Sequence, residues 1–382
     1  MVAVPGPIQP MTDTPRSVVP PHLRAGAVPS PRAAAAPSSD AFHSSGQSPG
    51  PVRTLHLLGP GRVGRALVPH LADLPLRVVA ISDTTATAFD RQGLPLAAIA
   101  AHKAAGGSLA SWPRAEAIPT ELAVRIVGAD VVVDATPTDQ ASVQAALQRA
   151  RAALQNGAFL AVAGKNALAE AAPQWLLGPH RGRVGVHAAL GGAGQALLRE
   201  LDELREHCRE LVLVGNVTTT VLIEAIERGG SLDDGLAVAR QLGLLEADPT
   251  QDLDGSDAAT KLRAVWGAVF ADAWTAPPAF DRIARTDARA LDPAVLRARA
   301  EQGLTTRLVA RGGRSGTDLR VAYEAVERGS PLAAPPDRVV YGYQLPSGLR
   351  VHTGLGIGHE RTAQALAKDL VAFFVRGQEG SR

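Results

Sequence analysis

The sequence predicts an α/β protein, in which a doubly wound parallel sheet is followed by a second domain of α+β character. Two observations predict this fold. From residue 53 to residue 163 short apolar runs alternate with helical patterns, and the first run leads into a glycine-rich turn at 59–64. Beyond about residue 185 the runs are less regularly spaced and end in a strand-rich segment, which indicates a change of architecture.

Buried strands and helices alternate in the first part of the chain, as they do in parallel sheets. The elements that we expect here are strands at 54–58, 76–82, 129–136 and 158–163 and helices at 62–74 and 140–155. Residues 93–122 are rich in Ala, Gly and Pro and have no sustained period. They should form a loop or a helical insertion that leads to the next strand.

The second part of the chain mixes both kinds of element. We expect a strand at 211–214, helices at 219–229 and 231–242, and strands within 338–353. The run Gly354–Gly358 then opens a last helix, in which Ala363, Leu366, Leu370 and Phe374 recur at helical spacing. This apolar face should let the helix pack back onto the first domain.

These patterns divide the chain into a tail, two domains and a C-terminal helix that joins the first domain. The boundaries that we expect are 1–51 for the tail, 52–185 for the first domain, 186–354 for the second domain and 355–378 for the helix. The tail is rich in Pro, Ala, Ser and Gly and lacks a helix or strand period, which is typical of disorder. An organelle transit peptide is an alternative, although many prolines do not suit an amphipathic helix. Met11 is an alternative start.

The composition argues against several kinds of partner. The formal net charge is +2 and both signs are mixed along the chain, so nucleic acid is not expected. Cys208 is the only cysteine, which rules out an internal disulfide and fits a reducing, cytoplasmic location. The chain has no apolar run of about 18 residues, so we expect a soluble protein with a small-molecule substrate and no membrane contact.

The turn Gly59-Pro60-Gly61-Arg62-Val63-Gly64 has the pattern G-x-G-x-x-G and lies between an expected strand and an expected helix. In a Rossmann-type domain the first glycine permits the tight turn, the second lets the backbone approach a pyrophosphate, and the third lets helix and strand pack closely. N–H groups at the start of the helix bind the anion. We therefore expect a dinucleotide cofactor here, with a plain glycine-rich turn as the alternative.

Asp83 ends the second expected strand, 19 residues after the last glycine of the turn. An acid at this place accepts hydrogen bonds from the adenosine ribose and disfavours a 2′-phosphate, which favours NAD. Arg62 could compensate a 2′-phosphate, so NADP stays open. Asp83 could instead cap the loop at Thr84 and Thr85.

An acidic segment at 243–262 contains five acids and one lysine. It does not match an EF-hand calcium loop, because the twelfth position would be Lys261. Asp257 and Lys261 are four residues apart, so they share one face of a helix that begins near Ser256. Carboxylates in this segment could bind the ammonium group of an amino acid, and Lys261 could give a proton to a carbonyl during hydride transfer. A surface ion pair is the alternative.

Lys165 follows the strand at 158–163, at the carboxyl end of the sheet where ligands of open α/β sheets bind. Thr136 and Pro137, after the preceding strand, should border the same crevice. The alternative for Lys165 is a solvated loop lysine.

Several of these motifs together resemble homoserine dehydrogenases in order and approximate spacing. The motifs are the turn at 59–64, Asp134-Ala-Thr136-Pro137, Gly164-Lys165-Asn166, the run from Glu246 to Lys261, and Gly354-Leu-Gly356-Ile-Gly358 with Thr362. The run E-A-D-P-T-x-D-x-x-G-x-D-A-A-x-K-L is the most specific of them, and the resemblance covers about residues 53–375. The chain is similar to the short, monofunctional form, which has no aspartokinase domain and no ACT domain.

The resemblance implies NAD(P)-dependent interconversion of L-homoserine and L-aspartate 4-semialdehyde, a step of threonine and methionine biosynthesis, in a homodimer formed through the second domain. It implies that Glu246 and Asp252 hold the substrate amino group. It also implies that Lys261 gives and takes the hydroxyl proton with Asp257 nearby, and that Lys165 lies between cofactor and substrate. The cofactor-binding residues that we expect are Gly59, Gly61, Arg62, Val63, Gly64, Asp83, Thr136, Pro137, Lys165 and Gly358.

Two segments depart from the family pattern. His187 and Gln195 stand where the family usually has a glutamate and a proline, in a segment that binds a monovalent cation in relatives. Loss of the glutamate argues against sodium or potassium here, although backbone carbonyls could still supply part of a site. Residues 215–219, Gly-Asn-Val-Thr-Thr, replace a family N-G-T-T-N run close to the substrate, so substrate preference or rate could differ.

Two other functions remain open at this point. One is a related amino-acid or semialdehyde dehydrogenase, which the altered 215–219 segment would permit and which substrate screening would reveal. The other is a catalytically weak protein that binds a nicotinamide cofactor. The joint presence of Lys165, Glu246, Asp252, Asp257 and Lys261 argues against that second alternative.

Overall fold

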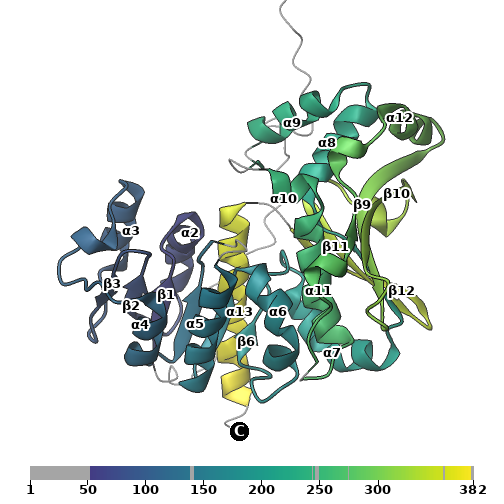
Figure 1. Cartoon of the computed structure of the whole chain (residues 1–382). Coiled ribbons are helices and arrows are strands. Elements are labelled where there is room, and N and C mark those ends of the chain that lie inside the picture. Colours follow the sequence, from purple (N-terminus) through teal and green to yellow (C-terminus); the bar gives the residue numbers. More distant parts are fainter. Residues whose placement is uncertain are drawn as a thin grey trace, which may run out of the picture. The chain divides into compact units, whose positions relative to one another are not determined.

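The computed structural model describes residues 52–137, 142–242, 244–245, 249–273, 275–355 and 358–379. The expected tail at 1–51 and Glu246 lie outside the described residues. All described residues belong to one compact unit, Gln47–Arg382. They form two six-stranded sheets with helices packed against them (Figure 1).

The first sheet has the strand order β3-β2-β1-β4-β5-β6. Its strands are β1 (Arg53–Leu58), β2 (Leu76–Ser82), β3 (Thr87–Phe89), β4 (Val131–Asp134), β5 (Phe159–Val162) and β6 (Val184–Gly185). Every pair is parallel except β2 with β3. The prediction of a doubly wound parallel sheet is confirmed, with β3 as an antiparallel edge strand. The direction of winding reverses between β1 and β4, whose carboxyl ends therefore flank the ligand-binding switch point.

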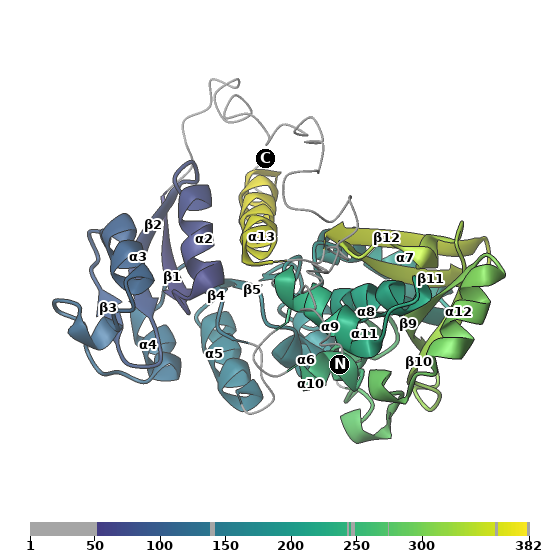
Figure 2. The same cartoon turned by 90° about the horizontal axis from the view of Figure 1, so that it is seen from above.

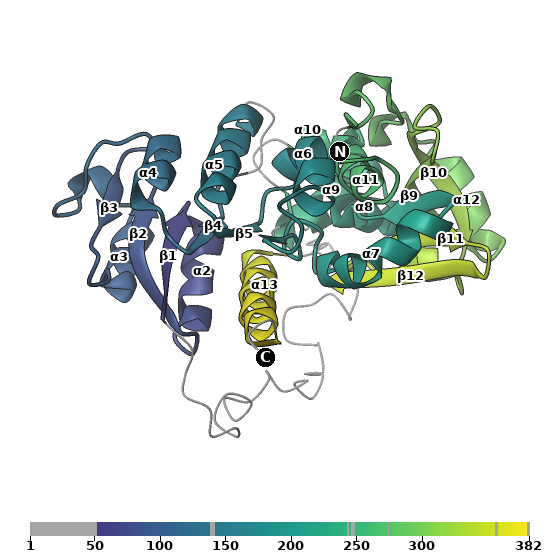
Figure 3. The ribbon, with the colours of Figure 1, turned by 90° about the horizontal axis from the view of Figure 1, so that it is seen from below.

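Helices cover both faces of this sheet. They are α2 (Arg62–Leu71), α3 (Leu96–Ala104), α4 (Thr120–Val127), α5 (Val143–Gln155), α6 (Lys165–Leu176) and α13 (His359–Glu379). Figures 2 and 3 show α2 and α13 on one face and α4 and α5 on the other. We expected the segment at 93–122 to be either a loop or a helical insertion, and it is a helical insertion. It also contains the 3₁₀ helix η2 (Leu109–Ser111).

The side chains of β4 explain why this sheet is buried on both faces. Val131 and Val133 pack with α2 and α13, whereas Val132 points to the α4 and α5 side. A continuous apolar run is therefore satisfied on both faces. The last helix packs back onto the sheet as expected, since Leu366 and Leu370 are fully buried in the same cluster as Val131.

The second sheet has the order β12-β11-β7-β9-β10-β8 and is antiparallel except where β8 pairs with β10. Its strands are β7 (Glu210–Val214), β8 (Ala284–Arg285), β9 (Leu304–Gly313), β10 (Arg320–Glu327), β11 (Arg338–Leu345) and β12 (Gly348–Leu355). The expected α+β character of the second part is confirmed. The sequence patterns missed β9 and β10, because both carry charged residues such as Arg307 and Glu324 inside otherwise apolar runs.

The helices of the second part are α7 (Gly194–His207), α8 (Val217–Glu227), α9 (Leu232–Gln241), α10 (Thr250–Leu253), α11 (Ser256–Val269) and α12 (Pro293–Glu301), with the 3₁₀ helices η3 (Phe280–Arg282), η4 (Ala288–Ala290) and η5 (Pro331–Ala333). Helix α11 contacts both α6 and β9 and is buried along most of its length. It therefore joins the two sheets. Within the described residues no helix combines the length and the apolar character needed to cross a membrane.

Candidate active site

The glycine-rich turn has the geometry that phosphate binding requires. Gly59 has a φ of 78°, and a Cβ there would lie 2.8 Å from backbone atoms of Ala135 and Thr136. A Cβ on Gly64 would lie 2.3 Å from the carbonyl oxygen of Gly59. A Cβ on Gly61, by contrast, would meet no atom within 4 Å, just before α2 begins. The first and third glycines thus permit packing and the second faces open space, so these residues fit a dinucleotide pyrophosphate.

A buried network holds Thr136 at the end of β4. Asp134 accepts hydrogen bonds from Thr136 Oγ1 at 2.6 Å and from the Thr136 backbone nitrogen at 3.1 Å. Arg149, on α5, donates from Nε to Asp134 at 3.0 Å and from Nη2 to Thr136 Oγ1 at 2.8 Å. Sequence reasoning missed Arg149, because a single arginine in a helical pattern gives no signal of a distant partner. The network fixes Thr136, and hence Pro137, beside the switch point.

The carboxylate of Asp83 forms hydrogen bonds and an ion pair with other groups of the protein. It accepts hydrogen bonds from the Thr85 nitrogen and hydroxyl and from the nitrogens of Ala86 and Leu109, and it forms a 2.6 Å ion pair with Lys103. Burial would raise the pKa of Asp83, but Lys103 and the other donors outweigh it and hold the pKa well below its usual range. A carboxylate has about four acceptor sites, so this occupancy supports a role as a loop cap.

Two lysines and one aspartate form the centre of the candidate site. Asp257 Oδ1 lies 2.9 Å from Lys165 Nζ and Asp257 Oδ2 lies 2.8 Å from Lys261 Nζ. Lys165 is the first residue of α6 and comes three residues after the end of β5, while Asp257 and Lys261 lie one turn apart on α11. Lys261 also donates to the carbonyl oxygen of Gly215. The packing of α11 on α6 thus brings a proton-donating group from the second part of the chain to the carboxyl end of the first sheet.

A second carboxylate lies beside this centre. Asp252, on the short helix α10, accepts hydrogen bonds at 2.8 Å from both Asn216 Nδ2 and Thr218 Oγ1. Asn216 caps α8 by accepting from the Thr219 nitrogen, and its Nδ2 also lies 3.3 Å from Asp257. Asn216 therefore bridges the two aspartates. The segment at 215–219, which departs from the family pattern, forms this part of the site.

The electrostatics of the two aspartates differ. Burial would raise the pKa of Asp257, but the ammonium groups of Lys165 and Lys261 outweigh it and hold this pKa well below its usual range. Burial and the nearby charge of Asp257 raise the pKa of Asp252, and the bonds from Thr218 and Asn216 only partly offset them. Asp257 thus stays ionised between its lysines, while Asp252 is the carboxylate that gains most from a new positive charge.

The side chain of His187 does not replace the anionic ligand that relatives have for a monovalent cation. Burial and the charges of Lys368 and Arg199 lower the pKa of His187 to about 4, so the imidazole is neutral near pH 7. Its Nδ1 accepts a hydrogen bond from the Gln195 nitrogen at 3.2 Å. Across the described ranges no group of three or more His, Cys, Asp and Glu side chains could hold a metal ion. The neutral ring therefore supplies no negative charge where relatives have a glutamate, whereas the carboxyl group of Asp369 accepts a hydrogen bond from the His187 backbone nitrogen at 2.8 Å.

The structure brings four of the expected site residues together, namely Lys165, Asp252, Asp257 and Lys261. Glu246 lies outside the described residues. Val63 lies in the first turn of α2, and Gly358 has a φ of 83° and accepts from Thr362 as α13 begins. Asn216 and Thr218 are the residues of the site that sequence reasoning left without a role. Their only signal was the departure at 215–219.

Two family models match the chain. The model described as glutamate/leucine/phenylalanine/valine dehydrogenase matches residues 51–177, which include the first five strands of the first sheet. The model described as homoserine dehydrogenase matches residues 197–371, which include the whole second sheet. The chain is thus similar to homoserine dehydrogenases. The resemblance that the sequence motifs indicated is therefore confirmed.

Individual relatives agree with this family. The homoserine dehydrogenase of Methanocaldococcus jannaschii is 26% identical over 220 residues, which cover 54% of this chain and 66% of that protein. The homoserine dehydrogenase of Mycobacterium leprae is 29% identical over 256 residues, which cover 63% of this chain and 56% of that protein. The chain thus matches two thirds or less of the length of these two relatives.

Solved structures of the family share the fold. A hyperthermophilic archaeal homoserine dehydrogenase in complex with NADPH aligns with a TM-score of 0.67 at 20% identity, over 85% of this chain and 98% of that one. The homoserine dehydrogenase of Thermoplasma acidophilum aligns with a TM-score of 0.60 at 21% identity, over 85% of this chain and 99% of that one. At these identities the similarity establishes the fold.

Proposed function

We propose that the protein is a homoserine dehydrogenase, which interconverts L-homoserine and L-aspartate 4-semialdehyde with NAD or NADP. The observation that carries this proposal is the placement of Asp257 between Lys165 and Lys261. Hydride transfer to a carbonyl needs a proton donor close to the reacting oxygen, and a buried carboxylate that binds two ammonium groups holds such a donor in a fixed position. The similarity to homoserine dehydrogenases supports the choice of substrate.

Lys261 is the proton donor in the direction of reduction. As hydride reaches the carbonyl carbon of the semialdehyde, the ammonium group of Lys261 gives a proton to the carbonyl oxygen, which becomes the hydroxyl of homoserine. In the reverse direction the neutral amine takes that proton back. Asp257 and the Gly215 carbonyl hold the lysine nitrogen in place from two sides. Lys165 adds a second positive charge where negative charge develops on the oxygen.

Asp252 binds the ammonium group of the substrate. Asn216 and Thr218 fix its carboxylate, and its raised pKa means that an incoming positive charge favours the ionised form. Glu246 contributes a second carboxylate by family resemblance. The substrate is thus held at its amino-acid end by carboxylates while its reacting end lies at the lysines.

The nicotinamide cofactor, when bound, supplies or accepts the hydride. The chain's own contribution is the turn at 59–64, whose open space at Gly61 and helix start at Arg62 accommodate a pyrophosphate. Thr136 and Pro137 would border the same crevice, and the network of Asp134 and Arg149 positions Thr136.

The test is a rise in absorbance at the reduced nicotinamide band when L-homoserine is added to the protein with NAD or NADP. We expect turnover in the wild type and loss of turnover in Lys261→Ala, whose affinity for the cofactor should be nearly unchanged. The control variant Lys368→Ala removes an exposed lysine from α13 and should keep full activity. A wild type that binds the cofactor but stays inactive in both directions would contradict the substrate assignment. Equal losses in both lysine variants would contradict the role of Lys261.

We further propose a cytoplasmic homodimer that pairs through the second sheet. The edge strand β12 supports this, because Leu349 and Leu355 lie on one of its faces and are 38% and 44% exposed. The single cysteine supports a reducing compartment. Light scattering on the purified protein measures the oligomeric state, and a monomer at micromolar concentration would refute the dimer.

A further inference from the structure

A polar cavity of about 180 Å³ lies at the C-terminal end of α8, away from the candidate active site. Glu224, Glu227, Arg228, Thr305, Arg307, Arg328 and Ala333 line it. Helix α8 begins beside Asp252 and ends at this cavity, and its 11 residues span roughly 16 Å. The cavity is much larger than the roughly 10–15 Å³ that admits one water molecule. It is therefore a separate site with room for a molecule of several non-hydrogen atoms.

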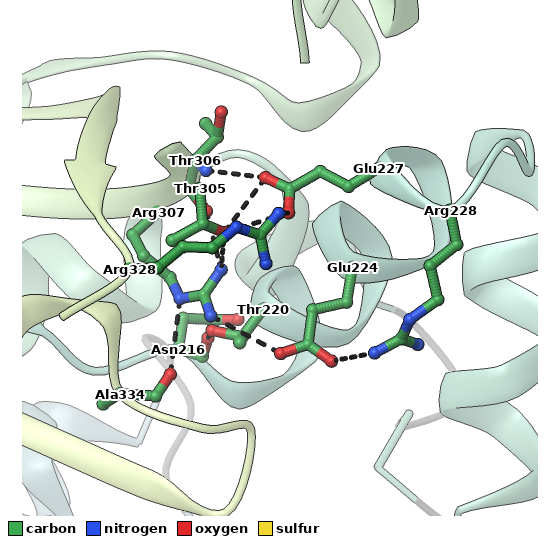
Figure 4. Close-up of polar contacts among 10 residues, drawn as sticks. All are labelled: Asn216, Thr220, Glu224, Glu227, Arg228, Thr305, Thr306, Arg307, Arg328 and Ala334. Atoms are coloured by element: carbon green, nitrogen blue, oxygen red, sulfur yellow. Dashed lines mark hydrogen bonds and ion pairs between the residues drawn. The ribbon is translucent and has the colours of Figure 1, made fainter. Parts of the chain in front are cut away.

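The floor of the cavity is rigid. The Arg307 side chain is 4% exposed, and it donates to the Ala334 carbonyl and to the Thr305 hydroxyl at 3.3 and 2.7 Å. The Glu227 side chain is 5% exposed and accepts from Thr305 Oγ1 at 3.0 Å and from the Thr306 nitrogen at 2.7 Å (Figure 4). These bonds to β9 and to the Ala334 carbonyl hold both charged groups in place independently of any occupant.

Among the described residues, two of the three ion pairs that reach into the cavity are long. Glu224 lies between Arg307 and Arg228 (Figure 4). It accepts from Arg228 at 2.8 Å but from Arg307 only at 3.4 Å, and Arg328 reaches Glu227 also at 3.4 Å. Charge-assisted hydrogen bonds between such groups are normally about 2.7–2.9 Å long. The guanidinium groups thus retain capacity for additional oxygen ligands.

The charge of the lining selects the class of ligand. Three arginines face two glutamates, so the cavity has an excess of one positive charge, and Ala333 is its one apolar side chain among the described lining residues. Arg228 and Arg328 are 47% and 54% exposed at the mouth, where a ligand enters. Guanidinium groups match the geometry of carboxylate and phosphate oxygens. We infer that this cavity binds a small dianion with carboxylate or phosphate groups, seated between Arg307 and the two outer arginines.

Calorimetric titration and thermal melting with two probes, inorganic phosphate and succinate, test the inference. The experiment uses the full chain at constant ionic strength with saturating NADP present, so that the phosphate-binding turn is filled. We expect at least one probe to bind the wild type with millimolar affinity and to raise the melting temperature. Binding of phosphate alone indicates a phosphate ligand, binding of succinate alone indicates an organic acid, and binding of both indicates the shared anion chemistry.

Variants at the mouth locate the binding. Arg228→Gln and Arg328→Gln should each weaken binding at least about tenfold, because each loses a charge-assisted contact of about 1.4 kcal/mol or more. Arg320→Gln removes the same charge at the other end of β10, from a side chain that is 49% exposed, and should bind like the wild type. The inference is wrong if neither probe binds at about 20 mM. It is also wrong if Arg320→Gln weakens binding as much as the two variants at the mouth.

Discussion

Replacement of Asp257 by asparagine should destabilise the protein, because the change leaves two lysines facing each other. In the wild type the two oxygens of Asp257 bind Lys165 and Lys261 at 2.9 and 2.8 Å. Asparagine keeps the shape but removes the negative charge. Two positive charges held roughly 5–6 Å apart repel by about 3 kcal/mol at an effective dielectric constant of about 20. Breaking a buried ion pair by removing one partner costs a similar amount, about 3–5 kcal/mol.

Thermal unfolding measures this effect directly. A loss of about 3 kcal/mol should lower Tm by about 4 °C in a chain of this size. A second change, Lys261→Met, separates charge repulsion from a general packing defect. On the wild-type background it should destabilise, because Asp257 loses one partner, whereas on the Asp257→Asn background it should stabilise by removing the repulsion. Asp202→Asn, whose ion pair with Arg181 is exposed, is the matched control and should change Tm little.

The reasoning would be refuted by equal effects of Lys261→Met on the two backgrounds. In that case Asp257 and Lys261 would not be coupled, and the ion pairs would contribute neither to stability nor to the placement of the proton donor. Turnover of Asp257→Asn provides a second readout. It should fall with little change in the affinity for the cofactor, since Asp257 contacts the lysines and not the turn at 59–64.

Two further predictions follow from the geometry. The Gly61→Val variant should fold normally, since a Cβ at this position meets no atom within 4 Å, but it should bind the cofactor at least about tenfold more weakly. The Gly64→Ala variant should instead have a lower Tm, since its Cβ would lie 2.3 Å from the Gly59 oxygen. Burial raises the pKa of Asp369 to about 7 in the folded protein. The folded protein therefore binds this proton more tightly than the unfolded chain does. The resulting stabilisation is fully present below about pH 4 and is lost as the pH rises through 7. Asp369→Asn should therefore gain stability relative to the wild type from about pH 4 to 7, by up to about 4 kcal/mol, and keep that advantage above pH 7.

Each of these two predictions has a clear contrary outcome. Unchanged cofactor affinity in Gly61→Val would show that the pyrophosphate does not approach the turn. For Asp369, melts across the pH range are compared with those of Asp281→Asn, which removes an exposed acid. A difference between Asp369→Asn and the wild type that does not vary with pH would mean that Asp369 does not titrate in this range.

Local patterns in the sequence determined most of the first part of the fold. The apolar runs of β1, β2, β4 and β5 are continuous because helices cover both faces of their sheet, so each run is visible without any knowledge of its neighbours. The turn at 59–64 is equally local, because the three glycines are required by contacts within a single strand–turn–helix unit. The pair of Asp257 and Lys261 also follows from helical spacing alone.

The tertiary structure decided what pairs with these local elements. Strands β9 and β10 were missed because Arg307 and Arg311 interrupt the apolar pattern of β9 and Glu324 interrupts that of β10. The ion pairs of Arg307 with Glu224 and of Arg311 with Glu324 stabilise these charges inside the sheet. Helices α6 and α7 were also not predicted from the sequence. Helix α6 contains Pro173, a residue that usually ends or kinks a helix.

The candidate site shows the same division. The sequence by itself determined that Lys165, Asp257 and Lys261 are candidates for chemistry, since Lys165 follows a recognisable strand and the other two share one face of an expected helix. It did not determine that one carboxylate binds both lysines, that Asn216 bridges Asp252 and Asp257, or that Asp83 is already occupied by Lys103. Those contacts join residues far apart along the chain, and their existence depends on how α11 packs against α6 and how the helical insertion returns to the first sheet. Periodicity records which face of an element is buried, but only packing decides which distant side chain lies opposite it.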